Sequence, residues 1–415
     1  MYSREGEIMK KKNGFTLVEL LAVIVILAVI LVIAMPKITD TIKNSKIASF
    51  ESSAKTIAAQ AEKKKMEKEI LEDTGSINCS DVVKLNNSDY GNCSITFDGN
   101  TAKVTLVGNG KFEGLQITNG TKDNAKAEEI KAPVYGKAVN YVNGLYAYDA
   151  SSNGLEKDTT SDANIRYVGA NPNNYVEFNG EAWRIIGVFG SNLKLVRDDK
   201  LITAYSFDNK TTAQGIETNK GTNDWTKSYL REFLNDYYYE GKTITCHSET
   251  NGTSTATNTT ITCPEINKIN ATAKSMIQKT MWNLGGIASG TKPVNELYIK
   301  ERGTGVYSGH ETKSNDYIGL IYPSDYVFAS TDESCSQNPY DSTCKNNNWL
   351  FKDARYWTIS PHLSNARGVF LVDGGGNLYD NAALYRASVR PSVFLKSDIN
   401  IVSGSGTKDD MFKLG

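Results

Sequence analysis

The longest apolar run of the chain lies near its start, where residues 20–35 include no polar side chain. The segment 15–35 would measure about 31 Å as a helix, which matches the hydrocarbon core of a bilayer. Three lysines, Lys10 to Lys12, stand just before it and favour a cytoplasmic position for the N-terminus. The pattern therefore predicts a membrane helix, with the rest of the chain on the outer side.

Apolar residues recur at helical spacing beyond this run, with lysines and glutamates between them. The recurring positions are Ile38, Ile42, Ala54, Ile57, Ala58 and Ala61. Pro36 removes a helical hydrogen bond and is expected to bend or loosen the helix as it leaves the membrane. Residues 62–69 mix lysine and glutamate, which indicates a solvated helix face. The helix is predicted to span 15–72 and to end near Gly75.

Short alternating segments replace the helical pattern after residue 77. Residues 94–97 and 103–107 are predicted to be strands of a hairpin, because Asp98-Gly99 between alternating segments is a turn signal. The polar stretch 118–129 is interpreted as a linker. Residues 73–130 are therefore predicted to form a small β region and a linker.

The remaining residues, 131–415, alternate between strand and helix patterns, and we call them the head. One helix is predicted near 225–237, where apolar side chains form a stripe, and another from Pro264 to Gly285. Strands are predicted at 175–178, 183–189, 193–196, 356–359, 368–372 and 389–395. Helices flanked by antiparallel strands predict an α+β fold.

The six cysteines of the chain fall into three near-neighbour couples, each around a short polar loop. The couples are Cys79 with Cys93, Cys246 with Cys263, and Cys335 with Cys344. An even count in such loops favours disulfides formed outside the cytoplasm. Six free or buried thiols in a reducing compartment are the alternative.

The apolar run also fits an ordinary signal peptide, with Val32 and Ala34 as small residues near its end, or a plain signal anchor. Neither explains Glu19 inside the segment. An ionisable side chain in hydrocarbon costs a few kcal/mol and is usually paired and functional. No residue of the run itself can neutralise Glu19, so its partner must come from elsewhere.

The segment Lys11-Lys-Asn-Gly14-Phe15-Thr-Leu-Val-Glu19-Leu resembles the processing motif of type IV pilins and pseudopilins. The resemblance covers about residues 9–60. It implies that a membrane prepilin peptidase removes the leader 1–14 by cutting after Gly14 and methylates the new amine of Phe15. Glu19 matches the family's acidic fifth mature residue, and Pro36 its proline at mature position 22. The implied partners are the peptidase, other pilin subunits, the assembly machinery and the membrane.

The physical chemistry of the segment agrees with this implication. Cleavage creates a positive amine on Phe15, and the Glu19 carboxylate of a neighbouring subunit could neutralise it. Opposite charges attract strongly in a bundle of low dielectric constant, and such pairs can set registry.

A second resemblance covers about residues 170–400. Trp183-Arg-Ile-Ile, Tyr356-Trp-Thr-Ile-Ser-Pro and Val389-Arg-Pro-Ser-Val resemble a module of Gram-positive surface proteins that is similar to the C-type-lectin-like and formylglycine-generating-enzyme fold. The sugar-binding motifs of C-type lectins, Glu-Pro-Asn or Gln-Pro-Asp with Trp-Asn-Asp, are missing from this sequence.

No catalytic motif is recognisable in the sequence, and we expect no enzyme. A catalytic cysteine pair would need a histidine or an acidic cluster to support Cys335 and Cys344, and neither is apparent. These two cysteines better suit a loop disulfide. His310 and His362 stand alone. The run 373–377, Asp-Gly-Gly-Gly-Asn, could wrap calcium or phosphate, but a tight turn explains it more simply. No metal ligand set or cofactor is predicted.

Composition and charge narrow the function further. The chain has 415 residues, 40% apolar and 22% charged, which suits two or three mostly soluble domains. Removal of the leader takes away four basic and two acidic side chains and changes the formal net charge from −1 to about −3. Direct nucleic-acid binding is therefore not expected, because nucleic-acid binders present a basic surface.

These observations predict a minor or tip subunit of a type IV pilus, since a head of this size would crowd a close-packed shaft. The precursor would lie in the inner (cytoplasmic) membrane, and the mature subunit in an extracellular filament. The head would bind an unknown extracellular glycan or protein, and its ligand-binding residues are unknown. A pseudopilin of a type II-like secretion system and a competence pilus for DNA uptake are the alternatives.

Overall fold

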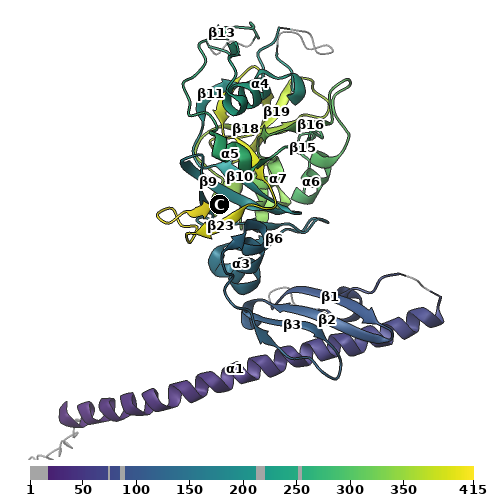
Figure 1. Cartoon of the computed structure of the whole chain (residues 1–415), viewed down its shortest axis with the longest axis vertical. Coiled ribbons are helices and arrows are strands. Elements are labelled where there is room, and N and C mark those ends of the chain that lie inside the picture. The colour runs from purple at the N-terminus through teal and green to yellow at the C-terminus, as the bar shows by residue number, and fades with distance from the viewer. Residues whose placement is uncertain (1–16, 73–74, 85–88, 212–219, 251–254) are drawn as a thin grey trace, which may run out of the picture. The chain divides into compact units, whose positions relative to one another are not determined.

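The computed structural model describes residues 17–72, 75–84, 89–211, 220–250 and 255–415. The chain forms two compact units, Met1–Ile130 and Lys131–Gly415. The second unit is the head. Figure 1 labels the elements of each unit.

One long helix, α1 (Leu17–Ile70), organises the first unit, and the short α2 (Cys79–Val82) follows it. The helix is continuous through position 36. Most side chains of the predicted membrane segment 15–35 lie outside the described residues, so that segment stays a prediction. Among the residues that the structure does describe, no helix has the length and apolarity needed to cross a membrane.

An antiparallel sheet packs on α1. Its order is β1-β2-β3-β4, with bounds Tyr90–Asp98, Thr101–Gly108, Leu115–Gly120 and Glu128–Glu129. Asp98 pairs with Thr101, so the predicted hairpin is present, and Gly99 supplies the positive φ of its turn. The 3₁₀ turn η1 (Gly110–Phe112) joins β2 to β3.

The core between helix and sheet uses small residues. Ala54, Ala58 and Ala61 of α1 are completely buried, as the helical spacing predicted. Alanines let a helix approach a sheet closely, because they add little volume at the contact. The larger buried side chains are Phe50, Ile57, Val104, Leu106, Phe112 and Ile117.

The predicted linker 118–129 is wrong as a loose connection. Ala125 is 2% exposed within the core of the first unit. The backbone N–H of Ala127 donates to Glu51 at 3.0 Å, and Lys122 pairs with Glu62 at 2.8 Å. Polarity alone suggested a linker, but these contacts with α1 make the segment part of the packed unit.

The head contains two main sheets within its described residues. The larger follows the order β14-β22-β10-β9-β8-β24-β23-β5, with β17 beside β22, β7 beside β9, and β6 beside β7. Its bounds are β5 Gly136–Lys137, β6 Leu155–Lys157, β7 Ile165–Tyr167, β8 Tyr175–Phe178, β9 Glu181–Phe189, β10 Asn192–Arg197, β14 Ile277–Gln278, β17 Ile318–Gly319, β22 Ser392–Leu395, β23 Asn400–Ser403 and β24 Phe412–Leu414.

The second sheet has the order β11-β21-β18-β19-β20, and two small strand pairs accompany it. Its bounds are β11 Ile202–Ser206, β18 Tyr356–Pro361, β19 Gly368–Val372, β20 Leu378–Ala382 and β21 Arg386–Val389. The pairs are β12 Cys246–His247 with β13 Thr260–Ile261, and β15 Thr280–Asn283 with β16 Lys313–Asp316.

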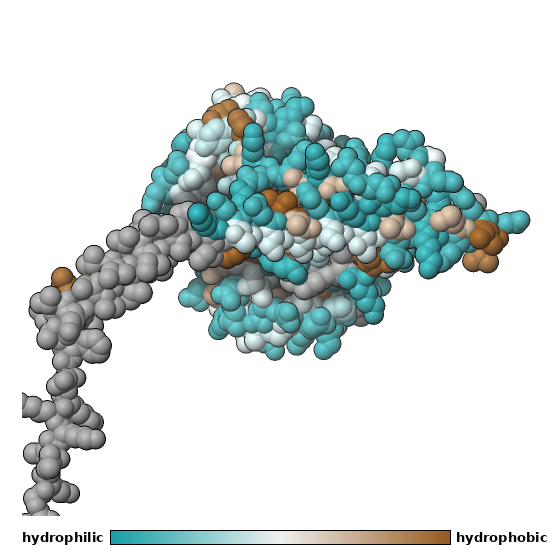
Figure 2. Space-filling model, turned by 90° about the horizontal axis from the view of Figure 1, so that it is seen from below, coloured by the Kyte–Doolittle hydropathy of each residue, from teal (hydrophilic) through white to brown (hydrophobic). Residues whose placement is uncertain are grey.

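Helices complete the head and, with its strands, confirm the α+β class. They are α3 Ala138–Asn153, η2 Trp225–Lys227, α4 Tyr229–Glu232, the π-helical η3 Phe233–Glu240, α5 Ala271–Met276, α6 Val294–Arg302, α7 Pro323–Phe328, α8 Glu333–Gln337 and η4 Ser342–Lys345. The face seen in Figure 2 is mostly hydrophilic where its residues are described, with small separate apolar patches. The five tryptophans of the chain are all buried in the core of the head.

One predicted helix is correct and the other is wrong. The stripe near 225–237 is helical from Tyr229 onward, and Trp225 and Phe233 are buried in the core, at 1% and 0% exposure. The segment from Pro264 to Gly285 holds only the short α5, followed by strands β14 and β15. Ile277 leaves the helical pattern because it pairs with Leu395 of β22, so tertiary strand pairing overrides local periodicity.

The structure contains three disulfides, each within a near-neighbour couple. Their sequence separations are 14, 17 and 9 residues, for Cys79–Cys93, Cys246–Cys263 and Cys335–Cys344. The first staples α2 to β1, and the other two close loops of the head.

The head disulfide Cys246–Cys263 can be tested for its effect on stability. Replacing both cysteines by serine should lower the free energy of unfolding by about 2–4 kcal/mol, because the unfolded chain gains freedom. All five tryptophans lie in the head, so their fluorescence in urea reports on the head alone. Non-reducing peptide mapping is the accompanying control, and a bridge between Cys93 and Cys246 would contradict the pairing.

Candidate functional site

The residues of the predicted processing site lie at or beyond the edge of the described structure. Gly14 and Phe15 are outside the described residues. Glu19 and Pro36 fall within α1, but their side chains are not described. The support for cleavage and assembly is therefore the sequence motif, and the candidate site that the structure describes lies in the head.

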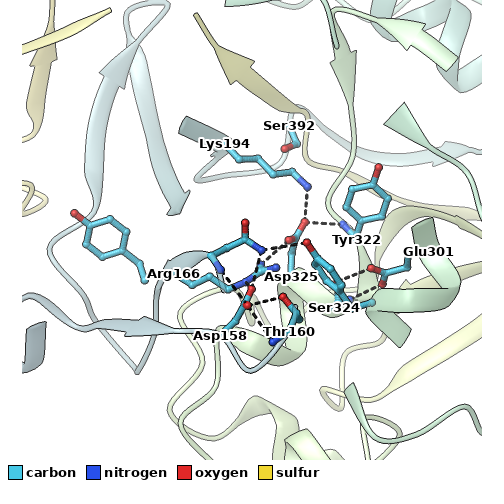
Figure 3. A network of polar contacts seen from close by, with 12 residues as sticks. Asp158, Thr160, Arg166, Lys194, Glu301, Tyr322, Ser324, Asp325 and Ser392 are labelled. Atoms are coloured by element: carbon cyan, nitrogen blue, oxygen red, sulfur yellow. Dashed lines mark hydrogen bonds and ion pairs between the residues drawn. The ribbon is translucent and has the colours of Figure 1, made fainter. Parts of the chain in front are cut away.

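A buried ionic network occupies the interior of the head (Figure 3). Asp325 of α7 accepts from Arg166 Nη1 of β7 at 2.8 Å and, through its other oxygen, from Lys194 Nζ of β10. Arg166 Nε donates to Asp158 at 2.6 Å. The backbone N–H of Tyr322 adds a bond to Asp325 at 2.9 Å. The four charged side chains of the network are at most 2% exposed, and two cations balance two anions.

The network shifts the pKa values of its members. Burial opposes ionisation of Asp325, but Lys194 and Arg166 overcome it and hold the pKa of this carboxyl well below its usual range. Burial lowers the pKa of Lys194 to about 8, although Asp325 acts in the opposite direction. Both groups are therefore ionised at neutral pH, which is the state that the ion pair requires.

Aromatic rings surround the ammonium group of Lys194. Its Nζ lies 4.3 Å from the ring centre of Tyr322, 5.3 Å from Trp282, 5.4 Å from Phe394 and 5.7 Å from Phe189. Cation–π attraction offsets part of the hydration that the lysine loses on burial. The same rings also form the apolar packing between β9, β15 and β22.

A second buried carboxylate lies beside the network. Glu301 of α6 accepts from the backbone N–H of Ser324 at 2.7 Å and from its hydroxyl. Arg302 Nη1 donates to the same carboxylate at 3.0 Å. Burial raises the pKa of Glu301, while Arg302 and Ser324 oppose the shift. Glu301 therefore fixes both the start of α7 and the guanidinium of Arg302.

Hydrogen bonds extend the network to the wall of a cavity. Asn164 Nδ2 donates to Asp158 at 3.0 Å and to the Tyr298 hydroxyl at 3.1 Å. The Tyr298 hydroxyl in turn donates to Asp162 at 2.5 Å. On the other side of the network, the Tyr322 hydroxyl donates to the carbonyl of Asn283 at 3.1 Å. The side chains that line the cavity are thus held by buried charges.

We call this space the aromatic cavity. Its volume is about 400 Å³. It is lined by Asp162, Asn164, Phe189, Gly190, Met281, Asn283, Tyr298, Arg302, Tyr322 and Phe394. Four aromatic rings and a few convergent polar groups are the composition expected of a small-molecule site, and the volume lies within the range of such sites.

A neighbouring space of about 310 Å³, which we call the acidic cavity, shares residues of the network. Asp158 and Arg166 belong to its wall, together with the carboxylates Glu156, Asp332 and Glu333. Asp332 is occupied by local bonds, since it accepts from the backbone of Ser334 at 3.0 Å and from Asn346 at 3.2 Å.

The other residues considered from the sequence have local partners. Asp373 Oδ1 accepts from the backbone N–H groups of Gly375 and Asn377 at 2.8 and 2.9 Å, which is a tight-turn arrangement. His362 Nε2 contacts the hydroxyl of Ser289 at 3.1 Å, and its Nδ1 accepts from the backbone N–H of Ser364 in its own loop at 3.2 Å. Among the described residues, no group of three potential ligands is placed to hold a metal ion.

Sequence reasoning missed the network and the aromatic cavity. Lys194 carried a misleading signal, because the alternation Asn192-Leu-Lys-Leu predicts that its side chain faces solvent. Arg166, Asp325 and Tyr298 carried none, since each has ordinary neighbours and meets its partners only through long-range contacts.

Asp325→Asn should destabilise the head strongly. The change leaves Lys194 buried without a carboxylate partner, and breaking a buried pair in this way costs about 3–5 kcal/mol. Glu177→Gln is the matched control, because its pair with Lys413 is exposed and should contribute about 0–1 kcal/mol. Urea denaturation followed by tryptophan fluorescence measures the free energy of unfolding of both variants. Equal losses would show that the buried network stabilises the head no more than an exposed ion pair does.

Comparison with known proteins identifies one feature of the chain. Residues 9–35 match the prokaryotic N-terminal methylation motif. No curated protein matches the chain, and no solved structure does. The predicted resemblance of the head to a lectin-like module therefore finds no support. The methylation motif itself indicates a type IV pilin-like or pseudopilin protein, and it implies processing by prepilin peptidase and assembly with other pilins.

Proposed function

We propose that this protein is a minor or tip subunit of a type IV pilus, whose head binds an extracellular ligand. The match to the methylation motif at residues 9–35 is the main support for the proposal, and the sequence there has Gly14, Phe15 and Glu19 at the spacing that cleavage and assembly would need. The first unit supports it, since a long helix packed against a small antiparallel sheet suits a filament subunit.

Processing creates the charged amine of Phe15, and assembly then pairs it with the carboxylate of Glu19. The peptidase cuts after Gly14 and methylates the amine of Phe15, while the precursor lies in the inner membrane. In the filament, Glu19 of one subunit pairs with the Phe15 amine of another. The pair compensates the burial of both charges in the apolar bundle and sets the registry of the helices.

The head accounts for the minor or tip position. Lys131–Gly415 has its own hydrophobic core and follows a first unit that is complete without it. A folded body of this size on every subunit would crowd a shaft. The aromatic cavity supports a binding role at the filament surface, because it combines apolar walls with polar groups held in place.

Gly14→Leu tests the cleavage position. A bulky residue should block the peptidase, so the full-length precursor should remain in the membrane. Wild-type surface protein should begin at methylated Phe15 by mass spectrometry. A surface protein that begins at Met35 would instead identify an ordinary signal peptide and overturn the proposal.

Glu19→Val tests the assembly role and so separates a pilus subunit from an ordinary anchored protein. Export and cleavage should be unchanged, but incorporation into sheared filaments should fall. An unpaired buried amine costs about 3–5 kcal/mol, which shifts an assembly equilibrium by about two to three and a half powers of ten.

Glu67→Val is the matched control for this experiment, because Glu67 lies on an exposed part of the same helix, with 49% of its side chain accessible. It should leave incorporation near the wild-type level. If Glu19→Val also incorporates normally, Glu19 has no role in assembly and the pilus proposal loses its main physical argument.

A further inference from the structure

We propose that the aromatic cavity of the head binds a neutral saccharide. The proposal rests on the ligand-binding role of the head given above and names the class of ligand and the groups that recognise it.

The walls of the cavity match the two kinds of surface of a sugar ring. A pyranose has an apolar C–H face and an edge of hydroxyl groups, so it pairs well with a site that joins rings to planar polar groups. Phe189 and Phe394 provide partly exposed rings. Tyr298 and Tyr322 also line the cavity but are each 4% exposed, and Arg302 covers one face of the Tyr298 ring. Met281 lies at the same cavity and is 52% exposed, which leaves an apolar surface accessible to a ligand.

Asp162 and Arg302 provide an acceptor and a donor. Asp162 uses Oδ2 to accept from Tyr298 at 2.5 Å, and Oδ1 can accept from a ligand hydroxyl. Within the described residues, the hydrogen bonds of Arg302 all use Nη1, which leaves Nε–H and Nη2–H as donors. Its guanidinium lies 3.3 Å from the ring centre of Tyr298, so it is stacked in a fixed orientation.

The charge of the cavity favours an uncharged ligand. Asp162 and Arg302 are the charged members of its lining, one of each sign. An acidic ligand would be attracted by Arg302 but repelled by Asp162, and a basic ligand would meet the reverse, so the lining as a whole favours neither sign of charge. A hydroxyl can accept from Arg302 and donate to Asp162, which satisfies both groups.

The cavity is also organised before a ligand arrives. Asp162 connects through Tyr298 and Asn164 to Asp158, and from there to Arg166. Arg302 is held by the buried carboxylate of Glu301. Side chains that are already fixed lose little conformational entropy on binding, which favours affinity for a small polar ligand.

The acidic cavity is a weaker candidate for the same ligand. Its carboxylates Glu156, Asp158, Asp332 and Glu333 exceed its cations, Lys157 and Arg166. Arg166 already binds Asp158 and Asp325, and its remaining Nη2 is buried. That cavity nevertheless provides a matched control, because Glu333 is exposed there.

The test measures binding of the full-length protein to a printed array of oligosaccharides, in a detergent without a sugar headgroup. The probes are neutral chains ending in glucose, galactose, mannose or an N-acetylhexosamine, together with sialylated and sulfated chains. The wild type should bind at least one neutral probe. Asp162→Asn should weaken that binding about tenfold or more, and Glu333→Gln should change it less than twofold.

Both variants change a carboxylate to the amide of the same shape, and tryptophan fluorescence confirms that the head remains folded. Met281→Ala is a second test, because it removes apolar surface from the cavity wall and should weaken binding without removing any polar contact. The proposal would be overturned if Asp162→Asn left binding unchanged or if only Glu333→Gln weakened it. It would also be overturned if the protein bound no neutral probe, or only sialylated or sulfated chains.

The array also separates this inference from the pilus proposal. It uses purified protein, so it does not depend on filament assembly. If filament incorporation depends on Glu19 but the protein binds no saccharide, only the saccharide site is refuted. Saccharide binding with no effect of Glu19 on incorporation would refute only the pilus role.

Discussion

The carboxylate of Asp325 is the point on which the structure of the head depends. It joins α7 to Arg166 of β7 and to Lys194 of β10, and both of these strands lie in the larger sheet, β7 and β10 each beside β9. Burying a charge costs several kcal/mol, and only a close set of opposite charges compensates it. Two cations and two anions meet here, so α7 is held at one place on the sheet.

This network also explains why the aromatic cavity has fixed walls. Its side chains come from α6, β9, β15, β22 and the turn between β6 and β7, segments that are distant in the sequence. Hydrogen bonds through Asn164, Tyr298 and Tyr322 connect them to the buried charges. The stability of the head and the shape of its candidate site therefore have a common physical origin.

The first unit is built on a different principle. Its core depends on small residues of α1 that lie against β2 and β3, with ion pairs such as Lys122–Glu62 at the edge. Alanine packing brings the helix and sheet close together. Two units with separate cores agree with the proposed division between assembly through the helix and ligand binding through the head.

The elements that the sequence predicted are those whose signals are local. The helical spacing of Ala54, Ile57, Ala58 and Ala61, the Asp98-Gly99 turn and the near-neighbour cysteine couples all act over a few residues. The predicted helix from Pro264 to Gly285 is wrong because Ile277 pairs with Leu395, more than a hundred positions later. The 118–129 linker failed for the same reason, since its contacts are with a helix distant in the chain.

The sequence by itself determined the processing motif at residues 9–35, because a peptidase reads a short linear segment that needs no tertiary partner. It also determined the α+β class, through local periodicity and turn residues. Only the tertiary structure decided that Lys194, Arg166 and Asp325 meet, and that Asp162, Tyr298 and Arg302 face one cavity. A buried charge is tolerated wherever folding brings it a partner, and a partner distant in the chain leaves no mark on the residues beside it.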